Sequence, residues 1–224
     1  MLFRREFLTL AGRTSLCAAF IVMSAGISQA QITGELWQNQ SSVAGNALLS
    51  SVAGLGTPDA LFNSGAINYQ SQVTAYTLGA YLNNPTFYNE SANFSTPVSG
   101  YGPNANLNNT VFYFTGNLYL NAGANSFVVA HDDGLQLNIG GGIGLVVNQP
   151  GATGEVFTPF NVTAPSAGTY SFQLVYGECC GAPADLVWTI NNQQIGTVPD
   201  GAATMSLLGI GLGALGVFGR RIKK

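Results

Sequence analysis

The sequence predicts an all-β fold, an antiparallel β-sandwich, on three observations. Only 8% of the 224 residues are charged and 29 are glycine, a composition typical of a turn-rich extracellular β protein. Apolar and polar side chains alternate with a period of two in Leu135–Ile139 and Tyr170–Tyr176, and no body segment has the pattern of a long amphipathic helix. Two similar turn–strand segments, NAGANSFVV and SAGTYSFQLV, favour two facing sheets.

Residues 1–30 predict a signal peptide that precedes a body of residues 31–195. Three arginines come before the apolar run Leu16–Met23, and Ser28–Ala30 is a small-x-small cleavage site. We expect cleavage after Ala30. The segment Arg4–Leu8 resembles a twin-arginine export signal, and the ordinary secretory route is the alternative.

The first half of the body has weaker patterns. Ile32–Gln38 is predicted as the first strand, whereas Ser41–Ala60 has no clean period and fits a short helix or a loop. Ala66–Leu82 carries β-branched and aromatic residues that predict one or two strands. Pro85–Asn109 is rich in Asn, Ser, Pro and Gly and predicts a long surface loop with at most one short strand.

The second half predicts strands more firmly. Thr110–Thr115 is a strand, and Asn117–Gly141 predicts a central hairpin followed by an acidic turn and a third strand. The glycine run Gly140–Gly144 predicts a second hairpin turn, since no helix follows it to form a phosphate loop. Further strands are predicted at Glu155–Ala164, Tyr170–Tyr176 and Leu186–Ile190.

The charges are distributed unevenly along the chain. All seven basic residues lie at the two ends, and none occurs between Arg13 and Arg220, where nine acidic residues lie. This arrangement excludes nucleic-acid binding through phosphate neutralisation and disfavours attraction to anionic lipid. It also leaves the acidic turn without a Lys or Arg to neutralise it.

The acidic turn contains the adjacent residues Asp132 and Asp133. Neighbours in a regular strand point to opposite faces, so their carboxylates meet only where the backbone departs from that geometry, which Gly134 makes inexpensive. Two carboxylates held together repel unless a cation or hydrogen-bond donors compensate, and calcium prefers such oxygen ligands. The alternative is a solvated hairpin turn with no ligand.

A second acidic segment, Gly177–Asp185, lies between the last two strands and brings Glu178 and Asp185. We expect it to face the first acidic turn. Its Cys179 and Cys180 are the only cysteines after the leader, and export favours their oxidation. An intrachain vicinal disulfide, acting as a stiff apolar platform, is preferred over an interchain link or two free thiols. A zinc site is disfavoured because the chain has one His and no second cysteine pair.

The patterns F-x-F-T-G-x-L-Y-L, A-G-x-x-S-F and D-D-G-L-x-L-x-I-G-G resemble the β-sandwich domain named for anthrax protective antigen, whose relatives include the yeast flocculin and epithelial-adhesin lectins. The resemblance is specific from Thr110 to Asn191. It implies that the aspartate pair is joined by a cis peptide and binds calcium, which in turn holds sugar hydroxyls. The implied metal ligands are Asp132, Asp133 and Glu178, the last where the lectins have an asparagine. The implied neighbouring ligand-binding residues are His131, Gly134, Cys179, Cys180 and Asp185.

The C-terminus, residues 196–224, resembles the tripartite exosortase sorting tail. Val198, Pro199, Asp200 and Gly201 form the motif, and an apolar run of residues 202–218 and a basic cluster follow it. The apolar run predicts a single transmembrane helix. The tail implies cleavage by exosortase near Pro199–Gly201 and release to the surface or matrix of a Gram-negative-type bacterium. A permanent membrane anchor is the alternative.

These features predict a non-enzymatic protein whose calcium-dependent domain binds glycans or exopolysaccharide. The alternatives are a structural matrix protein without a specific ligand and a glycoside-active enzyme. The enzyme is disfavoured because the body has one His, no Lys or Arg and no nucleophile motif. Adjacent carboxylates do not by themselves provide the opposed acid and base of a glycosidase.

Overall fold

The computed structural model describes residues 32–71, 74–83, 93–94 and 104–195, which all belong to one compact unit of residues 27–199. The predicted signal peptide and sorting tail, with their helices and processing residues, lie outside the described residues and stay predictions. None of the helices in the described part of the chain has the length and apolarity needed to cross a bilayer.

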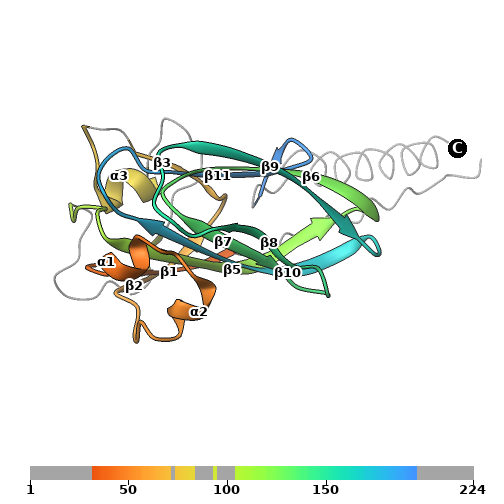
Figure 1. The fold of residues 1–224 in the computed structure, drawn as a ribbon, viewed down its shortest axis with the longest axis horizontal. Coiled ribbons are helices and arrows are strands. Elements are labelled where there is room, and N and C mark those ends of the chain that lie inside the picture. The colour runs from red at the N-terminus through yellow and green to blue at the C-terminus, as the bar shows by residue number, and fades with distance from the viewer. Residues whose placement is uncertain (1–31, 72–73, 84–92, 95–103, 196–224) are drawn as a thin grey trace, which may run out of the picture. The chain divides into compact units, whose positions relative to one another are not determined.

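The described residues form an antiparallel β-sandwich, as the sequence predicts (Figure 1). Within them, a larger sheet has seven strands in the order β4-β2-β1-β5-β10-β7-β8. A smaller sheet has five, in the order β12-β11-β6-β9, with β3 also paired to β11. The strands are β1 (Ile32–Trp37), β2 (Ala60–Ser64), β3 (Asn68–Gln70), β4 (Asn93–Phe94), β5 (Thr110–Leu120), β6 (Gly123–Asp132), β7 (Leu135–Ile139), β8 (Gly144–Gln149), β9 (Val156–Ala164), β10 (Gly168–Glu178), β11 (Asp185–Ile190) and β12 (Gln193–Gln194). The helices are short: α1 (Ser41–Ala44), α2 (Leu49–Val52) and α3 (Leu78–Asn83).

The main core lies between the sheets and is built from alternate residues of the strands. The alternating apolar residues of β10, from Tyr170 to Tyr176, are buried, and so are Leu186, Trp188 and Ile190 of β11. Trp188 of β11 meets Phe172 edge-to-face, with ring centroids 5.0 Å apart. Each such buried aromatic side chain contributes about 1.5–3 kcal/mol of hydrophobic stabilisation.

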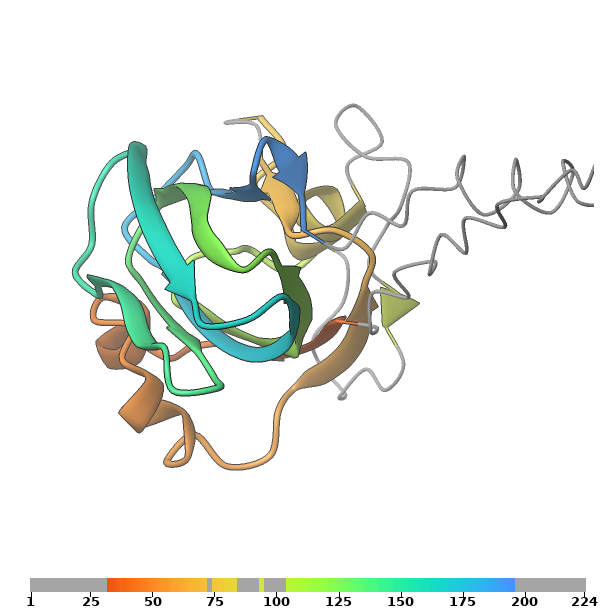
Figure 2. The same cartoon turned by 90° about the vertical axis from the view of Figure 1, so that its right-hand side faces the viewer.

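A second apolar cluster covers the outer face of the larger sheet. The segment that has no clean period forms α1 and α2, which lie outside the sandwich in the end-on view of Figure 2. Ala44 and Ala47 of this segment pack on Trp37, Val111 and Val175. This cover explains why Val175 is buried although it lies on the outward side of the β10 alternation.

The predicted central hairpin is wrong. β5 pairs with β1 and β10 in the larger sheet, whereas β6 pairs with β9 and β11 in the smaller one. The chain changes sheets again between β6 and β7, at Asp133 and Gly134. A tight-turn signal shows that the chain reverses but not which sheet receives the next strand. The hairpin predicted at Gly140–Gly144 is confirmed between β7 and β8.

The weaker predictions for the first half are partly confirmed. β1 and the short strands β3 and β4 occur where strands were expected. The end of the Ala66–Leu82 segment forms α3 instead of a second strand. There the Thr77 hydroxyl accepts a hydrogen bond from the Ala80 amide at 3.3 Å. Leu78, Tyr81 and Leu82 of the helix are buried.

Candidate functional site

The aspartate pair lies where the chain leaves the smaller sheet for the larger one. The Asp132–Asp133 peptide bond is cis, as the resemblance implies. Asp132 ends β6 and pairs across the sheet with Asp185, the first residue of β11. Asp132 is 7% exposed and Asp133 is 4% exposed, so the alternative of a solvated turn does not hold.

Both carboxylate oxygens of Asp133 accept backbone hydrogen bonds. Oδ2 accepts the N–H of Cys179 at 2.8 Å, and Oδ1 accepts the N–H of Thr153 at 3.0 Å. Burial raises the pKa of the Asp133 carboxyl, and the two amides lower it. Asp133 therefore connects the β8–β9 and β10–β11 loops to the turn.

Asp132 stands among other acids. Burial, followed by repulsion from Asp133, Asp185 and Glu155, raises the pKa of Asp132 to about 6. Burial and repulsion from Glu155 likewise raise the pKa of Asp185 to about 6. The sequence places no Lys or Arg between residues 14 and 219, so no cationic side chain of this body relieves the repulsion.

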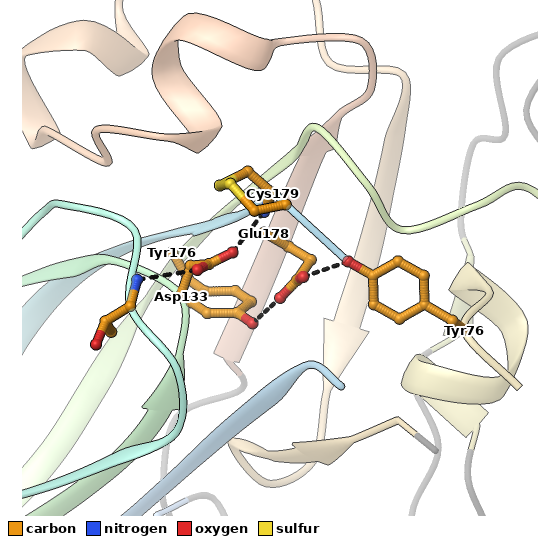
Figure 3. The surroundings of a disulfide bond; sticks show 7 residues. Tyr76, Asp133, Tyr176, Glu178 and Cys179 are labelled. Atoms are coloured by element: carbon orange, nitrogen blue, oxygen red, sulfur yellow. Dashed lines mark hydrogen bonds between the residues drawn. A yellow bond between two sulfur atoms is a disulfide. The ribbon is translucent and has the colours of Figure 1, made fainter. Parts of the chain in front are cut away.

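Glu178 is placed differently from its expected position. It is the last residue of β10 and is fully buried, so the loop proper begins at Cys179. Its two carboxyl oxygens contact the hydroxyls of Tyr76 and Tyr176 (Figure 3). The Tyr176 hydroxyl also donates to the main-chain carbonyl of Asp132. Glu178 is thus joined to the aspartate pair through a tyrosine.

Burial favours the protonated form of Glu178. It raises the pKa of the Glu178 carboxyl to about 9; the hydrogen bonds that the Tyr176 and Tyr76 hydroxyls donate to the carboxyl lower it, and repulsion from Asp133 and Asp132 adds to the rise.

The second acidic segment faces the turn, as predicted. Besides the Cys179 amide bound to Asp133, the N–H of Gly177 donates to the carbonyl of Gly134 at 2.9 Å. Cys179 and Cys180 form the predicted vicinal disulfide, with Cys179 buried and Cys180 exposed. The disulfide therefore forms the rim of the loop beside the Asp133 carboxylate.

The two remaining predicted residues support the turn from inside. His131 is fully buried, with Nδ1 2.5 Å from the Asp133 carbonyl oxygen and Nε2 2.7 Å from Oε1 of Gln149. Gly134 does not have a left-handed backbone. A Cβ there would lie 2.1 Å from the carbonyl oxygen of Pro150, so glycine is required by close packing rather than by the turn conformation.

Sequence reasoning missed Tyr76, Tyr176, Thr153 and Gln149 as parts of the site. A signal existed for one of them: the period of two that turns Tyr176 inward also turns Glu178 inward. Tyr76 and Thr153 lie in segments without a periodic pattern, and only the tertiary structure brings them to the turn.

Comparison with known proteins identifies the fold. No model of a known protein family matches the chain, and no curated protein does. The PA14 domain of the antifreeze protein MpAFP matches with a TM-score of 0.55 and 20% identity over 76% of this chain and 83% of that domain. The fold is similar to that of a PA14 domain.

Two further structures show weaker likeness to this PA14-like domain. The sugar-binding PA14 domain of an RTX adhesin has a TM-score of 0.49 and 25% identity, over 75% of this chain and 91% of that one. The epithelial adhesin 6 A domain of Candida glabrata, solved with Galβ1-3GlcNAc, has a TM-score of 0.48 and 14% identity, over 77% and 85%.

The aspartate pair supplies the kind of donor atoms that a calcium site needs. Asp132 and Asp133 offer carboxylate oxygens, which are the ligands that calcium prefers, and their mutual repulsion is of the kind that a cation relieves. Glu178 does not fit as a ligand in this arrangement, because it is fully buried and burial favours its neutral form.

Proposed function

We propose that this PA14-like domain is a non-enzymatic, calcium-dependent carbohydrate-binding or adhesion module of an exported protein. The observation that supports the proposal best is the buried, cis-linked pair Asp132–Asp133 in a body without Lys or Arg. When bound, calcium would supply open coordination positions for neighbouring sugar hydroxyls. The sequence resemblance to lectins that bind sugars in this way agrees with the assignment.

In this proposal the acidic residues have different roles. Asp132 and Asp133 hold the ion, and Asp185, the cross-strand neighbour of Asp132, adds negative charge close by. Glu178 takes a supporting role instead of the ligand role expected from the sequence. Through the Tyr176 hydroxyl it positions the main chain of Asp132.

The vicinal disulfide would contact the bound sugar. Both sulfurs lie within 4.8 Å of the Asp133 carboxylate oxygen, and Cys180 is exposed. A sugar coordinated at Asp133 would therefore reach the disulfide, whose apolar surface suits the C–H face of a pyranose ring. The ligand class is a glycan, or a matrix exopolysaccharide, with one hydroxyl-rich edge and one apolar face.

Calcium binding is the direct test. Calcium is expected to stabilise the exported chain against thermal unfolding, by about 2.7 kcal/mol at a concentration 100-fold above Kd. Asp132→Asn and Asp133→Asn should each abolish the shift, whereas Glu35→Gln on β1 should keep it. Binding to a glycan array with calcium or with chelator then tests the sugar. No stabilisation at millimolar calcium would exclude the proposal.

A structural matrix role is the second candidate, and one observation favours it. Both oxygens of Asp133 already accept backbone amides at 2.8 Å and 3.0 Å, so the turn is partly stabilised without an ion. A calcium shift with no glycan binding would support this candidate. Turnover of a glycoside that Glu178→Gln abolishes would instead indicate an enzyme, which the full burial of Glu178 makes the least favoured alternative.

The proposal includes export and sorting to the envelope. Exosortase is the proposed partner at Val198–Gly201, and the apolar run 202–218 would hold the chain in the membrane before cleavage. Mass spectrometry of the surface-associated protein should find a first residue of Gln31 and a last residue near Pro199–Gly201. A C-terminal Lys224 in that protein would show that it is not processed and would favour a permanent anchor.

A further inference from the structure

The β10–β11 loop places two sulfur atoms beside a carboxylate from another part of the chain. One carboxylate oxygen of Asp133 and the Sγ atoms of Cys179 and Cys180 all lie within 4.8 Å of one another. Ligands of one zinc ion are separated by no more than about 4.6 Å, since Zn–S and Zn–O bonds are about 2.3 and 2.0–2.2 Å long. The carboxylate oxygen therefore lies close to a metal-binding spacing from both sulfurs, whereas the two sulfurs are bonded to each other and must separate before they can bind one ion.

We propose that reduction of the Cys179–Cys180 disulfide converts this corner into a site for a thiophilic divalent ion of the zinc class, with Asp133 as the third protein ligand. Two molecules of a small thiol supply the electrons: the protein S–S bond breaks, both protein sulfurs become thiols, and the small thiol becomes its own disulfide. Each protein thiol then releases its proton to solvent as its metal–sulfur bond forms. Water completes the coordination.

Hydrogen bonds independent of the disulfide hold the loop in place after reduction. The Cys179 amide donates to Asp133 at 2.8 Å. At the far end of the loop, the Ala184 amide donates to the Ser71 hydroxyl and the Ser71 amide donates to the Ala184 carbonyl, both at 2.8 Å. The freed sulfurs therefore stay beside the carboxylate.

Access and charge both suit a soft cation. Cys180 is exposed, so a small thiol and then a metal ion reach the sulfurs from solvent. Thiolates select zinc-class ions over calcium, whereas the proposed calcium site uses oxygen ligands only. Asp132 and Asp185 nearby add negative charge, and no Lys or Arg in residues 14–219 opposes a cation.

Cobalt(II) is the probe for this site, because thiolate ligation gives it a charge-transfer absorption in the near ultraviolet. The test uses the full chain with Cys17→Ser, so that only the vicinal pair supplies thiol groups. The reduced protein is expected to show the absorption and to lose it when zinc is added, and the oxidised protein is expected to show none. Cys180→Ser should remove most of the signal. Asp133→Asn should weaken zinc binding by at least the roughly tenfold that outer-shell changes cost.

Asp132→Asn is the matched control, since Asp132 is not within the three-ligand cluster. It removes only a neighbouring charge, so it should weaken cobalt and zinc binding to the reduced protein much less than Asp133→Asn does, although the same variant should lose calcium in the oxidised protein. The two proposals can therefore fail separately. Absence of the absorption from the reduced protein would overturn the inference. Unchanged zinc affinity in an Asp133→Asn protein that circular dichroism shows to be folded would also overturn it.

Discussion

The calcium-free domain is expected to lose stability as the pH rises from about 5 to about 9. Burial raises the pKa of Glu178 from 4.5 to about 9, so the folded state binds a proton that the unfolded state has lost over this range. Stability from this group is fully present below pH 4.5 and disappears as the pH passes about 9. The free energy of unfolding should fall by up to about 1.4 kcal/mol per pH unit.

Asp132 and Asp185 also make the folded state more stable at low pH than at high pH, over a lower pH range. Their pKa values are raised from 3.8 to about 6, so their effect is lost between those two values. The loss above pH 7 is therefore assigned to Glu178. Urea unfolding in the presence of a calcium chelator, repeated at several pH values, measures both windows.

Glu178→Gln isolates the contribution of Glu178. The amide does not titrate, and its carbonyl oxygen can still accept a hydrogen bond from a tyrosine hydroxyl. The variant should match the parent to within about 1 kcal/mol at low pH and should lack the decline above pH 7. An equally steep decline in the variant would contradict the protonated state of Glu178. Leucine at this position should be less stable than glutamine at every pH, because it removes the hydrogen-bond partner of the Tyr76 hydroxyl.

The sequence predicted the parts of the fold that rest on alternation and on local turns. β10 and β11 are half-buried strands whose apolar residues recur every second position, and their inward residues are correctly predicted. The hairpin between β7 and β8 follows from a glycine run between two apolar segments. The assignment of β5 and β6 to different sheets could not be predicted locally, because the choice of partner strand depends on distant residues.

In the candidate site, too, the local motifs could be predicted from the sequence, whereas the contacts between distant residues could not. The aspartate pair and the cysteine pair stand out in the sequence, and the structure brings them together through the Cys179 amide. The environment of Glu178 could not be predicted from its charge. Its burial depends on Tyr76, which lies more than a hundred positions earlier in the chain, and on the inward turn of Tyr176.

Gly134→Ala is expected to disrupt both the fold and the site. Its Cβ would lie 2.1 Å from the Pro150 carbonyl oxygen and 2.8 Å from that of Gly151, and backbone atoms cannot move aside as a flexible side chain does. The Pro150 carbonyl also accepts the Ala47 amide at 2.8 Å, so displacing it disturbs the α1–α2 segment. We expect the free energy of unfolding to fall by about 3 kcal/mol or more, the upper part of the range for overpacking.

The same displacement should reach the aspartate pair. Thr153, whose amide donates to Asp133 at 3.0 Å, follows Pro150 by only three residues. Any calcium-dependent stabilisation of the parent should therefore be weakened in the variant as well. Gly154→Ala is the matched control, because nothing lies within 4 Å of a Cβ at that position of the same loop, and it should change stability by no more than about 0.5 kcal/mol. Similar denaturation midpoints for the two variants would show that the loop backbone shifts at little energetic cost. Close packing would then not require glycine at position 134.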